Sequence, residues 1–541
     1  MERKGRLSVN WLRIWYMLCF FALGIIDQRR GSARGEVQMT AANTVGLVTA
    51  AMLLPSLQLS RLKNKVYGYW TICAGISGII ACIWGWNYWL YKGQWVSAVL
   101  VAVVWSYLIL YIFREREALA LRKRVLNPFF LCVEGMFLFM CLSVREDWAP
   151  LMLLILFGGL YVIGIPKDFQ EDFFQGMLNG IICWFFVQQI IAFGFRPYDY
   201  VRYRGLYSGE TQNGLFYMIA YCAFLMKWLW IKEKGKHRFW SWLCFFLAAG
   251  CVSFTLFTGG RSPFVGIGLA TLGIFIWYDI AYGKSFFRFL MHGMLLLACL
   301  VVTYPMVYGC IRYLPTILHH PVWFEGEYNA STSIVSSDPW DSPKYISFER
   351  ATDVNIGRIL AAIGIDIYEW KEGGIGSVGV MKVHAQELEE PGDTAENPFT
   401  LPGAERGNSV DVRKVIHVYC IQHMNWRGHS REREGFYIID GTLIDHAHNM
   451  FLEIGYNHGI LAGVLFTGLY IYSFLRAFKR RRVEGMLCVT FLLAILGFGM
   501  FEMAVVPGQI TVGLMGILFY FAGETDGARS ESGKLPIGQE D

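Results

Sequence analysis

Two histidines stand where a polar segment of the chain meets an apolar one. His446 and His448 come directly before a mostly apolar stretch that extends to Phe466. If that stretch is a helix, its N-terminus offers a partial positive charge and free N–H groups, which keep a nearby imidazole neutral near pH 7. A neutral imidazole accepts a proton, as a general base must. His448 is therefore a candidate base, and the alternative is an interfacial histidine or helix cap without a catalytic role.

Arginines in short polar segments are a second group of candidates. Arg261 lies in the turn TGGRSP between two apolar stretches, Arg202 and Arg204 precede another apolar stretch, and Arg358 lies in a longer polar segment. A guanidinium between two apolar spans is costly unless something pairs it, and its planar fork suits a diphosphate. Several arginines and a histidine on one side of a membrane therefore indicate an anionic site, although contact with lipid headgroups is the alternative.

The chain as a whole has the composition of a helical membrane protein. Of its 541 residues, 55% are hydrophobic and 17% are charged, whereas roughly a quarter of the residues of a soluble protein are charged. Many of its apolar segments reach the roughly 17 residues that a helix needs to cross a bilayer. The sequence thus predicts an all-α polytopic membrane protein with about 12–14 transmembrane helices. The hydrophobic segments are 8–26, 40–59, 69–89, 95–113, 128–144, 150–166, 173–195, 213–231, 239–258, 263–282, 288–309, 448–474, 485–504 and 507–523.

Lysine and arginine in the short loops predict the orientation, because cytoplasmic loops carry the excess of basic residues. With the N-terminus inside, the dense basic clusters at 114–124, 232–238 and 476–482 all fall on the inside. The first outside loop is an exception, since DQRRGSARGE contains three arginines. The net charge of +5 is small and divided among short clusters, so no nucleic-acid partner is expected.

The same alternation predicts four parts of the chain. They are about eleven transmembrane helices in 1–309, one large extracytoplasmic loop domain in 310–447, about three transmembrane helices in 448–523, and a disordered cytoplasmic tail in 524–541. Within the loop domain, apolar residues at helical spacing predict an amphipathic helix over 355–370. The polar stretch 387–409 is expected to be solvated, and 412–424 to form a short strand or helix.

Other titratable residues have mainly structural interpretations. Nearly all of the thirteen cysteines lie in apolar runs, where cysteine acts as a small hydrophobe, so neither a disulfide nor metal binding is expected. A structural role is the favoured interpretation for Glu453 and Glu502. For Glu134, a structural role and a functional role are equally compatible with the sequence. Three loop histidines are spaced by six residues, which suits a solvated basic segment better than a metal site: His417, His423 and His429.

Four segments together resemble the superfamily of O-antigen ligases and Wzy-type polymerases. A family pattern of His-Asn with a later glycine matches HNMFLEIGYNHGILAG through His448, Asn449 and Gly459. The family's arginine turn resembles TGGRSPFVGIGLA, although Gly260 stands where serine is usual and Val265 where leucine is usual. Two further family segments resemble RYRGLYSGETQNG and GRILAAIGIDIYEWKEGGIGSVG. All four appear in the family's order within about 202–475, and the segment between the last arginine and the histidine is longer than in compact members.

The resemblance implies a GT-C-like fold and a metal-independent, inverting glycosyltransferase in the bacterial inner membrane, with its active site facing outside. Its donor would be a glycan on undecaprenyl diphosphate, its acceptor a glycan or lipid hydroxyl, and membrane lipids its surroundings, with no cofactor. Arg261 and Arg358 would hold the diphosphate, and His448 would deprotonate or orient the acceptor. The remaining positions would bind substrate: Arg202, Arg204, Asn213, His446 and Asn449.

Three functions remain open at this point. An O-antigen ligase transfers a finished glycan to a different acceptor, whereas a Wzy-type polymerase transfers it to another lipid-linked repeat unit, and both use the same residues. A flippase or transporter of lipid-linked oligosaccharide is the third. Charged residues within the apolar segments are sparse, which disfavours transport because a flippase needs a polar interior path. The resemblance implies transfer without a nucleotide sugar, and the absence of a Walker or dinucleotide-binding fingerprint in the chain is consistent with this.

Overall fold

The fold is described from a computed structural model of the chain. The residues that it describes are 5–29, 36–57, 101, 104–114, 126–145, 149–198, 202–207, 209–235, 237–319, 348, 351–352, 355, 409–430, 436–437, 443–444, 446–480, 483–505 and 509–523.

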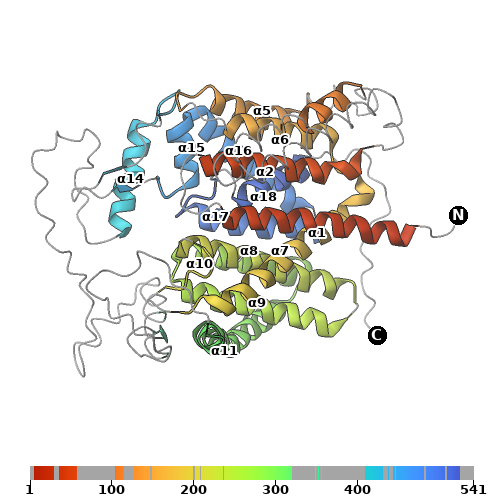
Figure 1. Ribbon diagram of the computed structural model, residues 1–541, viewed down its shortest axis with the longest axis vertical. Helices are drawn as coiled ribbons and strands as arrows, with labels where there is room; N and C mark the ends of the chain where they lie inside the picture. The colour runs from red at the N-terminus through yellow and green to blue at the C-terminus, as the bar shows by residue number, and fades with distance from the viewer. Residues whose placement is uncertain are drawn as a thin grey trace, which may run out of the picture.

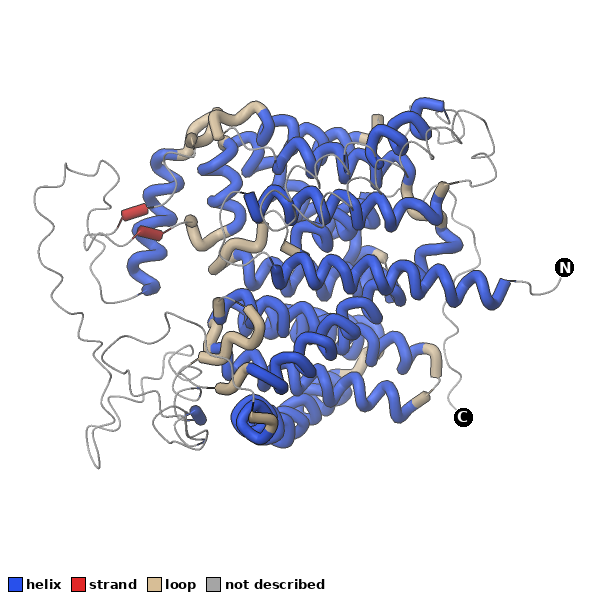
Figure 2. Tube along the Cα trace, in the orientation of Figure 1, coloured by secondary structure: helices blue, strands red, loops and turns tan. Residues whose placement is uncertain are grey.

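The described part of the chain is a bundle of helices that lie side by side (Figure 1). Loops join them at the two ends of the bundle (Figure 2), and one pair of two-residue antiparallel strands, Phe436–Tyr437 and Leu443–Ile444, lies beside α14. The helices are α1 (Gly5–Arg29), α2 (Glu36–Leu53), η1 (Leu54–Ser56), α5 (Pro128–Cys141), α6 (Ala149–Ile163), α7 (Lys167–Phe195), α8 (Glu210–Glu233), α9 (Arg238–Thr258), α10 (Arg261–Phe275), the π-helical η3 (Ile276–Tyr282), α11 (Phe286–Ile317), α14 (Ser409–His423), α15 (Met450–His458), α16 (Ile460–Lys479), α17 (Val483–Gly499) and α18 (Ile510–Gly523).

The helical architecture agrees with the prediction of a multi-pass membrane protein. Among the described residues, six helices are long and apolar enough to cross a bilayer, and five shorter apolar helices accompany them. The long ones are α7, α8, α9, α10 with part of η3, α11 and α16. The predicted segment 69–89 lies outside the described residues. So do the helix expected over 355–370, except for Asn355, and the stretch 387–409, except for Ser409.

Hydrogen bonds between distant segments assign the helix ends to the two ends of the bundle. At one end, which we call the histidine end, Tyr198 bonds to Ile311 and Tyr203 bonds to Phe257 through their backbones. Ile510 at the start of α18 donates there to Asp27 near the end of α1. At the opposite end, Asn127 contacts Gly523. Among the described helices, the ends that these bonds join lie together as the predicted alternation requires.

The predicted segment 448–474 is wrong as a single helix. The chain breaks at Gly459, whose φ of +100° lies in a region that side-chain-bearing residues rarely adopt. The short helix α15 ends there, and α16 folds back against it, so that Gly455 and Gly463 face each other. The backbones can approach this closely because neither residue carries a Cβ. The histidines consequently precede a nine-residue helix at the end of the bundle, not a membrane span.

Substituting Gly463 by alanine is expected to loosen this hairpin. The new Cβ would lie 2.8 Å from the Cα of Gly455, and such overpacking costs about 1–3 kcal/mol. We expect a lower thermal unfolding temperature for the purified variant in detergent. Gly468→Ala on the same helix is the matched control, because a Cβ added at Gly468 would have no neighbouring atom within 4 Å. Equal unfolding temperatures for both variants would contradict the close contact.

The segment 412–424, predicted as a short strand or helix, belongs to helix α14. Ile416 and Cys420 are fully buried and form a small apolar cluster with Ala447 and Tyr456. The i, i+4 spacing of Ile416 and Cys420 gives the helix one apolar stripe. This stripe packs α14 against the turn that carries the two histidines, and Figure 1 shows α14 next to α15 at the left end of the bundle.

Candidate active site at the histidine end

Glu502, just beyond the end of α17, connects two histidines and an arginine. Its Oε2 lies 3.2 Å from Nδ1 of His448 and 3.5 Å from Nε2 of His446. Its Oε1 accepts a hydrogen bond of 2.9 Å from Nη2 of Arg413 on α14. We call these four residues the histidine cluster. It brings together residues from the α15 turn, α14 and the end of α17.

Glu502 is ionised in this setting. Its side chain is only 12% exposed, and burial by itself raises the pKa of a carboxyl. Hydrogen bonds from His446 and His448 and the charges of His448 and Arg413 outweigh that effect and lower the pKa of Glu502 to about 2. The carboxylate is therefore available near neutral pH as an acceptor for both imidazoles.

The geometry of His448 suits a base. In the neutral form of the ring, the Nδ1 that faces the carboxylate carries the proton, and the lone pair of Nε2 is then available to accept another. The residue has φ +51°, in the left-handed region that favours glycine. Strain of this kind persists only where the surroundings enforce it, and it is typical of functional sites. The side chain is 19% exposed, so the ring remains accessible.

Asn449 and Glu453 hold the histidine turn in place. The side chain of Asn449 caps α15 by accepting from the backbone N–H groups of Phe451 and Leu452, and it donates to the carbonyl of Met500 beside Glu502. Glu453 accepts a 2.7 Å hydrogen bond from the backbone N–H of Ala447, between the two histidines. The structural role expected for Glu453 therefore includes positioning the turn. Asn449 was expected to bind substrate, and in the structure its side chain makes hydrogen bonds that position the same turn.

His417 lies one turn after Arg413 on α14 and faces the backbone of Ala447 and His448. Burial lowers its pKa, so this ring is neutral near pH 7. Its Nε2 is buried and has no hydrogen-bond partner among the described residues. The expectation of a solvated histidine is wrong for His417. It is also wrong for His429, which is buried and stacks on Tyr456.

Arg261 is the first residue of α10, at the histidine end. It is exposed and has no acidic or hydrogen-bond partner among the described residues. α10 and α17 are antiparallel and touch at Gly266 and Gly497. Arg261 lies five residues before Gly266 on α10, a rise of about 7.5 Å along the helix. Glu502 lies five residues after Gly497, just beyond the end of α17. Arg261 and Glu502 therefore lie on neighbouring segments, at a similar height along the bundle axis.

The other predicted arginines have different environments. Arg202 donates at 3.5 Å to the carbonyl of Gly259, two residues before Arg261. Arg204 forms an ion pair of 3.0 Å with Glu210 at the start of α8. Asn213 is fully buried and donates to the carbonyl of Tyr203, which holds this loop in place. These residues frame the loop beside the Arg261 turn, and Arg358 lies outside the described residues.

The histidine cluster also contains a set of possible metal ligands. One ligand atom from each of His446, His448 and Glu502 lies within 4.8 Å of the other two. No metal was expected here, since the family resemblance implies a metal-independent enzyme, and Glu502 lies 54 residues from His448 in the chain.

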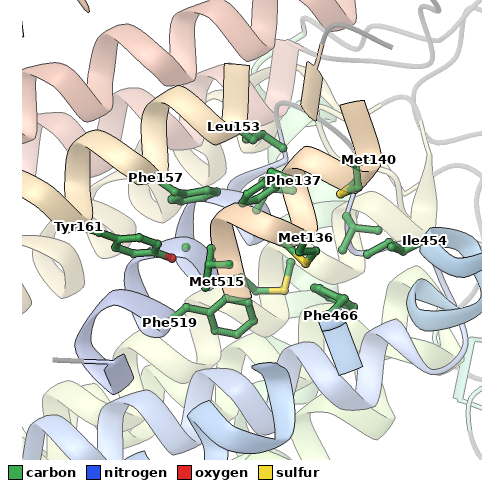
Figure 3. Close-up of a pocket in the computed structure, with 14 residues that line it drawn as sticks. Met136, Phe137, Met140, Leu153, Phe157, Tyr161, Ile454, Phe466, Met515 and Phe519 are labelled. Atoms are coloured by element: carbon green, nitrogen blue, oxygen red, sulfur yellow. The ribbon is translucent and has the colours of Figure 1, made fainter. Parts of the chain in front are cut away.

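An apolar pocket adjoins α15. Its cavity volume is about 50 Å³, and Figure 3 shows the side chains that line it. Aromatic rings and methionines from α5, α6 and α18 point into it, together with Ile454 of α15 and Phe466 of α16. Ile454 directly follows Glu453, so the pocket and the histidine turn share one helix. The lining residues are Val133, Met136, Phe137, Met140, Leu153, Phe157, Tyr161, Ile454, Phe466, Val505, Val512, Met515, Gly516 and Phe519.

Glu134, next to the pocket residue Val133 on α5, faces α6. A Cβ added at Gly158 would lie 3.3 Å from its Oε1, and this atom has no hydrogen-bond partner among the described residues. At the opposite end of the bundle, Nδ1 of His292 lies 2.7 Å from Oδ2 of Asp279, and its Nε2 lies 3.1 Å from Nζ of Lys232. Oδ1 of Asp279 is buried and has no hydrogen-bond partner among the described residues.

Arg413 was not identified as a site residue from the sequence, and Glu502 was interpreted as structural. Arg413 lies in a basic stretch that is typical of a solvated segment, and Glu502 lies among apolar residues. The available signal was the placement of Glu502 three residues beyond an apolar helix, at the end of the bundle where the histidines were expected.

The fold and the histidine cluster together define a multi-pass helical membrane protein with a carboxylate–imidazole–guanidinium site at one end. No protein-family model matches this chain, and no curated protein or solved structure shows significant similarity to it.

The low pKa of Glu502 predicts a pH-dependent contribution to stability. The pKa falls from 4.5 in the unfolded chain to about 2 in the folded protein. The carboxylate therefore stabilises the fold fully at pH values above 4.5, and this stabilisation is lost as the pH falls toward 2. The contribution is about 3 kcal/mol at neutral pH. Glu502→Gln removes it, so the difference in unfolding temperature between wild type and variant should shrink by more than half between about pH 6 and pH 3. A constant difference would contradict the ionised carboxylate.

Proposed function

We propose that this protein is a membrane glycosyltransferase that moves a glycan from an undecaprenyl-diphosphate carrier to an acceptor hydroxyl, in the manner of an O-antigen ligase. The observation that carries the proposal is the contact between His448 and the ionised Glu502. It orients a base at the same end of the bundle as the turn of Arg261, a cation that has no acidic partner in the part of the chain that the structure describes. A base and an anion-binding group are the two functions that such a transfer requires.

In this mechanism, Nε2 of His448 accepts the proton of the acceptor hydroxyl as its oxygen attacks the anomeric carbon. The bond between that carbon and the diphosphate oxygen breaks, and its electron pair leaves with the diphosphate. Attack from the face opposite to the leaving group inverts the anomeric configuration. Glu502 stabilises the imidazolium that forms, as the carboxylate of a catalytic triad does.

Arg261 stabilises the negative charge that develops on the diphosphate. A guanidinium donates two parallel hydrogen bonds to phosphate oxygens and keeps its charge at any relevant pH. Arg202, bonded to the carbonyl of Gly259, holds the turn that presents Arg261. By the resemblance noted above, Arg358 would join Arg261 at the diphosphate. In the proposed mechanism these cations take the place of a divalent metal.

The apolar pocket next to α15 supports a lipid carrier. Its lining contains no charged side chain, and it includes Ile454 of α15, the helix that Asn449 caps. An isoprenoid chain placed there would bury apolar surface and leave its diphosphate toward the histidine end. With the orientation that the basic loops predict, this end faces the outside of the cytoplasmic membrane, where a GT-C-like fold presents its large loop.

One experiment tests the proposal and separates its two forms. Purified protein is incubated with a lipid-linked glycan alone and then with a separate acceptor. Transfer only after the acceptor is added supports the ligase, and a ladder of chain lengths from the donor alone supports the Wzy-type polymerase. Transport of the intact donor across a vesicle membrane, without new glycosidic bonds, would instead support the flippase and reject the transferase.

Chelation is expected to leave transfer intact. Because Arg261 and His448 supply the charge and the base, EDTA in the assay should not reduce the initial rate. The rate is measured with the lipid-linked donor before and after dialysis against the chelator. Complete loss of activity, restored by a single divalent metal, would contradict this mechanism.

A further inference from the structure

We propose that His446, His448 and Glu502 form a binding site for Zn²⁺ or a similar borderline divalent metal, and that occupation of this site inhibits the protein reversibly. The metal site is independent of the proposed function, whereas the inhibition rests on it. The three ligand atoms converge from two segments that are 54 residues apart in the chain, so the arrangement is a product of the fold.

The spacing of the ligand atoms fits a tetrahedral zinc ion. Zinc bonds to imidazole nitrogen and carboxylate oxygen are about 2.0–2.2 Å long, which places neighbouring ligands of a tetrahedron about 3.4 Å apart. Oε2 of Glu502 lies 3.2 Å from Nδ1 of His448 and 3.5 Å from Nε2 of His446. All three atoms lie within 4.8 Å of one another, so small rotations of the imidazole rings complete three corners and leave a fourth open.

The surroundings of the three residues also fit a bound ion. Their side chains are between 12% and 28% exposed, so a metal can enter without unfolding the turn. Arg413 holds Oε1 of Glu502 and so directs Oε2 toward the imidazoles, as partners beyond the ligands commonly do. Its positive charge opposes a second cation, and the site has only one carboxylate. Binding is therefore expected to be reversible.

Metal binding and base catalysis exclude each other at His448. The base requires a proton on Nδ1 and a free lone pair on Nε2. A metal on Nδ1 takes the lone pair of that atom, so the neutral ring then carries its proton on Nε2 and cannot accept another from a hydroxyl. Zinc thus switches the imidazole to the inactive tautomer and withdraws Glu502 from it.

The site is tested first by binding, without any transfer assay. Purified full-length protein is freed of metal with a chelator, dialysed, and titrated with Zn²⁺ against a chromogenic competitor, and Co²⁺ is added separately to record the visible spectrum of tetrahedral coordination. We expect saturable binding by the wild type, and at least tenfold weaker binding by His446→Gln and by Glu502→Gln. His423→Ala, which changes an exposed histidine of α14, should bind as the wild type does.

Equal zinc affinity for the wild type and for both ligand variants would overturn the proposal, because the metal would then occupy cysteines or surface groups. Two variants are used so that a folding defect in one, detected by size-exclusion chromatography, leaves the other informative. In the transfer assay, Zn²⁺ should lower the rate over the concentration range in which it binds, and chelator should restore the rate. Binding without inhibition of a working transferase would overturn the inhibitory role. Binding by a protein that catalyses no transfer would leave the site standing and reject the proposed function.

Discussion

Replacing His448 by alanine is expected to reduce glycan transfer by roughly 10²–10⁴-fold, the usual contribution of a positioned general base. The change removes the only group in the histidine cluster whose Nε2 is both free and oriented by an ionised carboxylate. The initial rate is measured with purified protein, lipid-linked donor and acceptor at saturating concentrations. Since the base acts in the transition state, the loss should appear in kcat more than in KM.

His423→Ala is the matched control for this change. It removes a histidine from the same end of the bundle, on the exposed surface of α14, and should retain the wild-type rate. The alanine variant of His448 should elute from size exclusion as the wild type does, because its side chain is partly exposed. A wild-type rate for His448→Ala would reject the base and with it the proposed mechanism.

Arg261→Ala is expected to lower the transfer rate by roughly 10²–10³-fold, the loss seen when one group that stabilises developing negative charge is removed. Arg261 is exposed and unpaired among the described residues, so its removal leaves no buried partner behind. Stability should therefore hardly change. Arg261→Lys should retain part of the rate, because lysine keeps the charge but loses the bidentate geometry.

The control for Arg261 is Arg238→Ala. Arg238 is likewise an exposed arginine at the first position of a helix, but α9 begins at the opposite end of the bundle. An equal loss of activity in both variants would indicate a general effect of helix-start arginines on folding or insertion. An unchanged rate in Arg261→Ala would remove this residue from the diphosphate site.

The helices themselves were predictable from the sequence because each is marked locally. Apolar runs such as 239–258 and 288–309 lie within α9 and α11, since a membrane span needs only length and hydropathy to be recognised. Alternating basic loops also predicted which helix ends lie together, and the hydrogen bonds between Tyr203 and Phe257 and between Ile510 and Asp27 agree with that pairing.

The break at Gly459 was not predictable in the same way. The run from Met450 to Lys479 is apolar enough to read as one helix, and an isolated glycine within a helical pattern is often tolerated. What divides it is the packing of Gly455 against Gly463 and the hydrogen bond from Ile460 to Asn425 in a distant loop. Only the folded chain brings those groups together.

The sequence by itself determined a helical membrane protein, the alternation of its helices, and His448 and Arg261 as candidates, because hydropathy, charge and residue type act locally along the chain. The tertiary structure alone decided that His448 faces Glu502, that Arg413 of α14 completes the pair, and that Asn213 and Asn449 hold loops in place. The physical reason is that the protonation and reach of a side chain depend on the charges a few ångströms away, and those charges belong to residues far along the chain.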